Sequence, residues 1–402
     1  MSSTGPATAD LAVIGAGVSG CALAAELRRR GWRGALSLLE IGRGPGGRSA
    51  TRRSRRDPAL AINHGAPLFN ITGSPEPHLL EPLRRGGWLQ PFAGAIHSLD
   101  AQGQLGPLRD DLFCSGQLWQ GQPQMDDLCR GLLALAAAGG GAAPTLRSST
   151  LVRWLQPGRD PDGGAGWTLL DGDGDVLLRC RWLVLSGTLL AHRRCRTVFG
   201  WDDIPLQRAA TQLDDPQLNR AAISLAAIDS SPSCHLLLTL PEAVAQAWRL
   251  QPWRLLSFTT AAQQRWGLRR VSLQPLRDGR WAVVAESSAD FARGHLQVYG
   301  SRSSAAQLLA APTDPNGEQQ VMAALERGLQ AALGLATAGA ERQLMRWGAA
   351  FPQAPGLDPG LALCRSSRIG FCGDAITGPG FGRVEGALRS AEALAARLLP
   401  QL

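Results

Sequence analysis

The sequence predicts an α/β protein with a parallel sheet in one domain and an α+β domain around an antiparallel sheet in the other. Three observations predict it: a strand–helix–strand opening, a strand followed by a helix at the far end, and alternating strands over 146–186. An opening of this kind is typical of a Rossmann-like domain. A chain of 402 residues has room for two to three domains.

The first forty residues carry the clearest pattern. Residues 10–14 are an apolar strand, 18–30 are rich in helix-forming Ala, Leu, Glu and Arg, and 35–40 are a second strand. Between the first strand and the helix lies Gly15-Ala16-Gly17-Val18-Ser19-Gly20. Glycines at this spacing allow a tight turn, close approach of a pyrophosphate and tight helix packing. The segment therefore predicts a dinucleotide site.

Glu40 strengthens this prediction because it ends the second strand. A carboxylate at that position can accept hydrogen bonds from both ribose hydroxyls of an adenosine. A glycine-rich turn without a ligand would leave Glu40 unexplained. We therefore expect an adenine dinucleotide, either NAD or FAD.

Two further motifs favour FAD. The loop after Glu40 contains Gly46-Gly47-Arg48, in which backbone can approach a ligand and Arg48 can pair with a phosphate. Near the other end, Gly373-Asp374 follows a strand at 368–372, and Arg383-Val384 opens a terminal helix over 383–399. Asp374 can bind ribityl hydroxyls, and the helix amides can face the flavin. A ligand held by both ends of the chain has the length of FAD.

The remaining elements follow from periodicity and turn residues. Residues 41–77 are expected to be a long loop around a ligand, 88–119 short strands, 125–138 a helix and 318–333 another helix. A strand is expected at 281–285. The run Asp171-Gly-Asp-Gly-Asp175 resembles a calcium loop, but the required glycine and bidentate glutamate are missing, so a hairpin turn is expected.

Composition excludes several functions. All 41 Lys+Arg residues are Arg, so a pyridoxal Schiff base, a Walker-type lysine and a lysine base are excluded. The net charge of +8 permits nucleic-acid contact, but no supporting motif occurs, and an anionic small molecule is the expected partner. The eight cysteines and six histidines are scattered, which predicts free thiols in the cytoplasm and no metal site. No apolar stretch is long enough for a transmembrane segment.

The motifs together resemble renalase-type flavoproteins, within the wider flavin amine oxidase superfamily. The likeness rests on the opening, on the run 46–53, on Asn63-His64-Gly65-Ala66-Pro67-Leu68-Phe69 and on the terminal motifs 373–374 and 382–386. It implies noncovalent FAD and an enzyme that oxidises dihydro-isomers of NAD(P) and passes electrons to oxygen. The cofactor residues that the motifs and the resemblance indicate together are Gly15, Ala16, Gly17, Ser19, Gly20, Glu40, Gly47, Arg48, Ala66, Pro67, Val152, Gly373, Asp374, Arg383 and Val384.

The chain departs from the family where the flavin ring is expected. The family reads Gln-Tyr where this chain has Pro67-Leu68, which leaves the substrate and catalysis itself open. Amine oxidation is disfavoured, because amine oxidases use a lysine and a tyrosine cage, whereas this chain has no lysine and one tyrosine, Tyr299.

Single residues have plainer alternatives. His64 is a weak candidate for acid–base catalysis, since hydride transfer to a flavin can proceed by positioning alone. The arginines at 52, 53, 55 and 56 can steer a phosphorylated substrate or form a solvated loop. Cys372 can be read as a flavin attachment point or as small apolar packing, and packing is favoured.

The resulting hypothesis is an FAD-dependent oxidase with a discontinuous FAD domain at 1–87, 120–195 and 345–402 and a substrate domain at 88–119 and 196–344. It oxidises a small reduced substrate, for which a dihydro-NAD(P) isomer is a candidate, with oxygen as acceptor. Two alternatives remain. One is a flavin oxidase or desaturase acting on an apolar substrate, and the other is a non-catalytic flavin-binding redox sensor or assembly factor.

Overall fold

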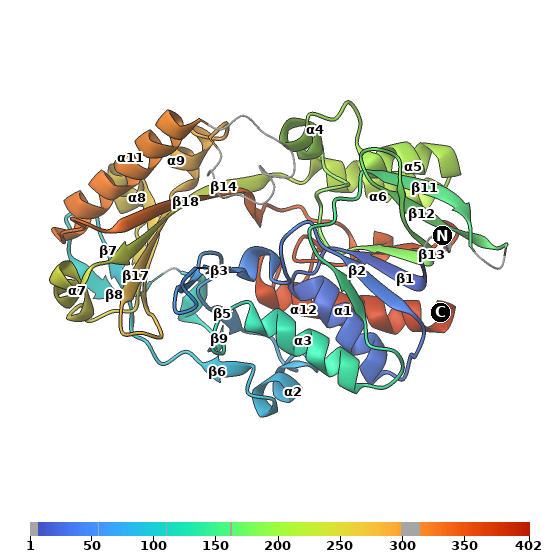
Figure 1. Ribbon diagram of the computed structural model, residues 1–402, viewed down its shortest axis with the longest axis horizontal. Coiled ribbons are helices and arrows are strands. Elements are labelled where there is room, and N and C mark those ends of the chain that lie inside the picture. Colours follow the sequence, from blue (N-terminus) through green and yellow to red (C-terminus); the bar gives the residue numbers. More distant parts are fainter. Residues whose placement is uncertain (1–6, 55, 110, 161–162, 299–313) are drawn as a thin grey trace.

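The computed structural model describes residues 7–54, 56–109, 111–160, 163–298 and 314–402. Two large sheets lie at opposite ends of the molecule, one carrying both marked termini and the other covered by α11 and its neighbours (Figure 1). Two long strands, β14 (Ser230–Leu240) and β18 (Glu341–Pro352), extend from the second sheet toward the first (Figure 1). The fold is α/β with more than one sheet, as the sequence predicts.

The first sheet contains the predicted Rossmann-like core. Its main path runs β10-β2-β1-β13-β12-β11, and β20 joins it by pairing with β13. The neighbours of the central strand β1 are parallel to it, whereas β12 and β11 form an antiparallel extension. Its strands are β1 (Thr8–Ile14), β2 (Leu36–Leu39), β10 (Thr145–Arg147), β11 (Trp154–Arg159), β12 (Ala165–Leu170), β13 (Val176–Leu185), β19 (Leu363–Cys364) and β20 (Ile369–Phe371).

The parallel strands end in register at one edge of this sheet. Ile14 lies beside both Leu39 and Leu185, and Leu185 lies beside Phe371. Ligands of open α/β sheets bind outside this carboxyl edge, because the loops that follow the strands meet there. The segments beginning at Gly15, at 40, at 186 and at 372 are thereby brought together.

Helices cover both faces of the first sheet. One face carries α1 (Val18–Arg29), α3 (Asp127–Ala138) and α12 (Val384–Leu398) around a buried cluster that includes Leu23 and Leu128. The other face carries α5 (Pro205–Leu213) and α6 (Pro216–Ala227) (Figure 1). Strands buried on both sides read as continuous apolar runs, which is why 10–14 and 35–40 could be recognised.

The second sheet is seven-stranded, in the order β18-β14-β17-β16-β15-β7-β8. All its pairs are antiparallel except β15 with β7. Its other strands are β7 (Ile96–Leu99), β8 (Leu105–Pro107), β15 (Leu255–Phe258), β16 (Leu268–Pro275) and β17 (Trp281–Ser287). The helices packed nearby are α7 (Glu242–Arg249), α8 (Thr260–Trp266), α9 (Ala289–Arg293) and α11 (Pro315–Leu333).

The segment expected as a loop at 41–77 contains short structure. It has a 3-10 turn, η1 (Gly47–Ser49), and three strands: β3 (Thr51–Arg53), β4 (Ala61–Asn63) and β5 (Phe69–Ile71). β3 pairs with β4, and β5 joins β6 (Leu89–Pro91) and β9 (Gln117–Gly121). Strands of three residues are too short to show a period in sequence, so the loop expectation was wrong here.

Short helices complete the described chain. They are α2 (Leu80–Arg85), α4 (Arg194–Phe199), η2 (Leu112–Cys114), η3 (Pro359–Leu361) and η4 (Leu399–Gln401). The predicted hairpin after β12 is confirmed, because Asp171 N–H bonds to the carbonyl of Asp175. No helix of the described ranges is both long and apolar enough to cross a membrane.

The predicted domain division stays a prediction, and packing bears on its boundaries. α5 and α6, placed in the substrate domain at 196–344, bury their apolar side chains on the first sheet. β18 pairs with β14 along its length, although 345–402 was assigned to the FAD domain. We propose that the first domain, apart from the segment with β7 and β8 that joins the second sheet, extends to about residue 229 and resumes near 353.

Candidate functional site

A cavity of about 830 Å³ lies between the carboxyl edge of the first sheet and strands β14, β16, β17 and β18 of the second. This volume is in the upper part of the range of about 300–1,000 Å³ found for cofactor and ligand sites. Its walls include the glycine-rich turn at Gly15 and, far from it in sequence, Trp347 on β18. The cavity therefore joins the two predicted domains.

Two glycine-rich loops pack backbone against backbone at the first end. Gly46 N–H donates to the carbonyl of Ala16 at 2.9 Å, and Gly17 and Gly46 form a parallel bridge. A Cβ at Gly47 would lie 3.1 Å from the Cα of Gly17, closer than an ordinary van der Waals contact, and Gly47 has a φ of +54°. The cradle thus depends on the absence of side chains. α1 begins directly after it, so its first N–H groups face this end.

Glu40 is buried at the same end. Its two carboxylate oxygens accept hydrogen bonds from Ala16 N–H at 2.7 Å and Gly42 N–H at 2.6 Å. Burial raises the pKa of Glu40, and the two backbone donors oppose that shift. Each oxygen still has a free lone pair for a ligand hydroxyl.

Arg48 and Asp374 meet in the middle of the cavity wall. Arg48 Nη1 donates to Asp374 Oδ2 at 2.7 Å and to the Ala350 carbonyl at 3.0 Å, and Nη2 pairs with Asp374 Oδ1. A second arginine, Arg194, lies close enough for Arg48 to lower its pKa, although burial is the main cause; the pKa falls to about 10. Arg194 was missed from the sequence because nothing around 194 resembles a motif.

Most of the predicted cofactor residues line this cavity. Those that line it are Gly15, Gly17, Ser19, Glu40, Gly47, Arg48, Ala66, Val152, Gly373, Asp374, Arg383 and Val384. Ala16 acts behind the wall through its bonds to Glu40 and Gly46. Gly20 packs on the first turn, where a Cβ would lie 2.2 Å from the Gly15 carbonyl. Pro67 is half-buried and is not part of the wall.

His64 occupies the other end of the cavity. Its ring stacks on Trp347 with centroids 5.4 Å apart, and its carbonyl accepts bonds from His235 Nδ1 and Trp347 Nε1. Burial, with His235 and Arg52 as smaller causes, lowers the pKa of His64 to about 3, so the ring is neutral at pH 7. Its Nδ1 is buried without a hydrogen-bond partner in the described part of the chain.

The floor of this end is a row of side chains across four strands. Met345 on β18 is paired in register with His235 on β14, His235 with Glu286 on β17, and Glu286 with Arg270 on β16. All four side chains line the cavity. Sequence reasoning missed them because Met345 is an ordinary apolar strand residue and the three polar residues stand in three different strands. The signal that could have found them is the presence of His, Glu and Arg, at positions that pair across neighbouring strands, in patterns typical of buried strands.

The arginines of the predicted loop divide into two groups. Arg52 and Arg53 line the cavity, and Arg53 is held by Asp126 at 2.7 Å and by Asp127 at 3.3 Å. Arg56 is exposed, and residue 55 lies outside the described ranges, as does Tyr299. Among the described arginines of this loop, Arg52 and Arg53 are therefore the ones that can meet a ligand in the cavity directly.

Cys372 lines the cavity beside Ser19. Burial raises the pKa of its thiol to about 12, with Ser19 opposing the shift. A protonated thiol is a poor nucleophile, so this environment favours the packing interpretation over flavin attachment.

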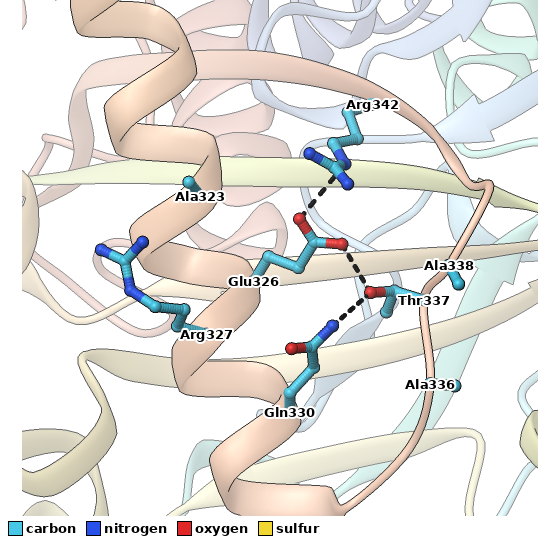
Figure 2. A pocket seen from close by; sticks show the side chains of 8 residues that line it. All are labelled: Ala323, Glu326, Arg327, Gln330, Ala336, Thr337, Ala338 and Arg342. Atoms are coloured by element: carbon cyan, nitrogen blue, oxygen red, sulfur yellow. Dashed lines mark hydrogen bonds and ion pairs between the residues drawn. The ribbon is translucent and has the colours of Figure 1, made fainter.

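Two other features of the described residues, a second hollow and a group of two carboxylates with a histidine, do not form a free ligand site. A smaller hollow of about 340 Å³ beside α11 is lined by a network in which Thr337 and Arg342 donate to Glu326, so its carboxylate is already bound (Figure 2). The carboxylates of Glu26 and Glu392 approach His78, but Glu26 is already paired with two arginines of α1.

The donor set of the large cavity fits an extended dinucleotide. A backbone cradle and a buried carboxylate stand at one end, Arg48 and Arg194 stand between, and a neutral histidine over a tryptophan stands at the other. FAD contains the matching groups in this order: adenosine, pyrophosphate, ribityl and a planar ring.

Comparisons with known proteins support the fold. A family model described as NAD(P)-binding Rossmann-like domain matches residues 13–85. A search of curated proteins gives no match. A putative protoporphyrinogen oxidase from Exiguobacterium sp. 255-15 is similar in structure over 100% of both chains, with a TM-score of 0.60 and 12% identity.

Two amine oxidases of known structure are also similar. Cyclohexylamine oxidase from Brevibacterium oxydans IH-35A matches 98% of this chain and 99% of its own, with a TM-score of 0.59 and 16% identity. Putrescine oxidase bound to putrescine matches 98% and 100%, with a TM-score of 0.54 and 13% identity. The chain therefore shares the fold expected from its resemblance to the flavin amine oxidase superfamily.

Proposed function

We propose that this protein is an FAD-dependent oxidoreductase that oxidises a small, reduced, anionic substrate, in the manner of the renalase-type enzymes it resembles. The observation that carries the proposal is the single cavity that joins the cradle at Gly15 and Gly46 to the polar floor on the second sheet. Bound FAD would supply the hydride acceptor, with oxygen as the proposed final acceptor.

The chain's own residues would hold the cofactor noncovalently. The amides at the start of α1 and the guanidinium groups of Arg48 and Arg194 would bind the pyrophosphate, and Glu40 would bind ribose hydroxyls. Asp374, fixed by Arg48, would present its remaining lone pairs to the ribityl chain. The protonated state of Cys372 supports noncovalent binding, so acid denaturation should release free FAD.

The charge of the other end supports an anionic substrate over an amine. Four arginines and two buried carboxylates line this part of the cavity: Arg52, Arg53, Arg270 and Arg346, and Asp126 and Glu286. A protonated amine entering this end would meet net positive charge in a low-dielectric space, which costs free energy. The chain also lacks any lysine, as noted from its composition.

His64 is proposed to position the substrate. Because its pKa is lowered to about 3, it is neutral at pH 7 and cannot act as a general acid from the imidazolium form. A nitrogen of the neutral ring can donate a hydrogen bond to a ligand or accept one from it, while the face of the ring packs on Trp347.

Absorbance of the purified protein and anaerobic reduction test the proposal. We expect a yellow protein with one FAD, whose absorbance is bleached by a small reduced anion and restored by oxygen, while amines leave it unchanged. Dihydro-isomers of NAD(P) and reduced carboxylic acids are the two classes of anionic donor compared. A colourless protein that cannot be reconstituted with FAD contradicts the proposal. Binding of FAD without reduction by any donor favours the redox-sensor alternative.

An apolar substrate is the second candidate. Leu68, Leu112 and Phe113 line the cavity near the floor, and they would suit a hydrocarbon chain. Bleaching by a polyene donor, with no response to dihydronicotinamides, would favour this desaturase-type reaction.

A further inference from the structure

Arg270 stands out among the cavity residues because its buried charge is poorly paired. Its side chain is 6% exposed, and the nearest oxygen of Glu286 lies 3.7 Å from Nη1, beyond hydrogen-bond distance. Within the described residues, its Nε is buried with no hydrogen-bond partner. A guanidinium has five N–H donors, and leaving such donors unbonded in a buried site costs free energy unless a ligand accepts from them.

The neighbouring arginine is held differently. Arg269 donates to Glu286 Oε1 at 3.2 Å, is near Asp111, and does not line the cavity. The register of β16 on β17 shifts between Leu268 and Arg270, so that Arg269 is the extra residue of a bulge. A bulge re-aims side chains, and here it lets both guanidinium groups approach one carboxylate. Glu286 therefore accepts a hydrogen bond from Arg269 and faces Arg270 only as a longer ion pair.

The surroundings keep Arg270 fixed in this position. Its guanidinium lies over the ring of Phe113 at 4.9 Å, and Glu286 beside it is buried. The two arginines lower the pKa of Glu286 against the effect of burial, so it is ionised. A planar guanidinium held over an aromatic ring is pre-organised for a planar anion.

We propose that Arg270 binds a carboxylate of the substrate, so that the oxidised molecule is a carboxylic acid anion rather than an amine or a neutral hydrocarbon. This inference rests on the proposed function in one respect, which is that the proposed function assigns the end of the cavity at Arg270 to the substrate. Arg270 is then the residue that selects the substrate, while Arg269 and Glu286 position it.

Binding of benzoate tests the proposal, with benzamide as the uncharged molecule of the same shape. Both are titrated into the full-length protein and followed by the fluorescence of its tryptophans, since Trp347 lines the cavity. We expect saturable binding of benzoate and at least about tenfold weaker binding of benzamide, as for one lost charge-assisted contact. Arg270→Met should lower the affinity for benzoate by about tenfold or more and leave that for benzamide unchanged.

Matched variants separate this effect from a loss of folding. Arg254→Met removes a guanidinium that also lies over an aromatic ring, Trp281, but does not line the cavity, and it should bind benzoate as the unmodified protein does. Arg270→Gln repeats the test with a polar side chain, and circular dichroism checks that each variant is folded.

Three results would overturn the proposal: no saturable carboxylate binding, equal affinity for benzoate and benzamide, or unchanged benzoate affinity in both folded Arg270 variants. The FAD content is measured separately. A protein that cannot be reconstituted with FAD but binds benzoate through Arg270 would refute the proposed function and keep this inference. A protein that holds FAD without Arg270-dependent binding would do the opposite.

Discussion

Arg48 and Asp374 are 326 residues apart in sequence and form a two-pronged ion pair in the wall of the central cavity. Asp374 is buried, and Arg48 is exposed only in part, toward the cavity that it lines. The pair therefore ties the loop after β2 to the end of β20. It also fixes the orientation of both groups toward any ligand between them.

Arg48→Met should lower both FAD retention and stability. It leaves the buried Asp374 carboxylate without its partner, which costs less than the roughly 3–5 kcal/mol of a fully buried pair but more than the 0–1 kcal/mol of an exposed one. We expect about 1–3 kcal/mol in urea unfolding. Arg293→Met, which breaks the exposed pair with Asp290, is the control and should change stability by less than about 0.5 kcal/mol. Equal effects of the two variants would show that the central pair is unimportant.

Glu40→Gln should weaken FAD binding. The carboxylate accepts from Ala16 and Gly42, whereas a glutamine offers one oxygen and places an NH₂ group against the second N–H. An unsatisfied buried donor costs about 1–3 kcal/mol, which corresponds to about five- to 150-fold in affinity for FAD. Isothermal titration of the apoprotein with FAD measures this. Glu81→Gln, at a half-exposed surface position, should bind FAD normally.

Gly65→Ala should be far more damaging than Gly44→Ala. A Cβ at Gly65 would lie 1.9 Å from the carbonyl oxygen of Arg48, so the backbone beside the cavity must move. A Cβ at Gly44 would meet nothing within 4 Å. We expect about 1–3 kcal/mol of destabilisation and loss of FAD for the first variant, and little change for the second. Similar urea midpoints for both would contradict the close packing of these loops.

His64 should make stability depend on acid pH. Its pKa is lowered to about 3 in the folded protein, against about 6.5 in an unfolded chain. Between these values the unfolded state binds the extra proton, so stability rises with pH and is lost as pH falls from about 6.5 toward 3, by up to about 1.4 kcal/mol per pH unit.

The variants His64→Gln and His64→Phe test this dependence by urea unfolding from about pH 4 to 7. Both substitutions remove the group that titrates. In each variant, the slope of the unfolding free energy against pH should therefore be smaller by the contribution of one bound proton. A slope that stays as steep as that of the unmodified protein in both variants would rule out a neutral, buried His64.

The dinucleotide end of the site was predictable because its evidence is local. Gly15, Gly17 and Glu40 lie within one strand–helix–strand unit, and their spacing follows from backbone geometry that any neighbour would preserve. The terminal motif at Gly373-Asp374 was recognisable for the same reason. The three-residue strands between 51 and 71 were not, because so few residues show no period.

The sequence by itself determined the α/β class, the carboxyl-edge cradle and the absence of any lysine chemistry, since these depend on short-range pattern and composition. Tertiary structure alone decided the polar end of the cavity, to which the proposed function assigns the substrate. His235, Glu286 and Arg270 come from three different strands, β14, β17 and β16, and become one polar floor only through strand register. Register is a property of paired strands, so no single segment carries the information that places these side chains together.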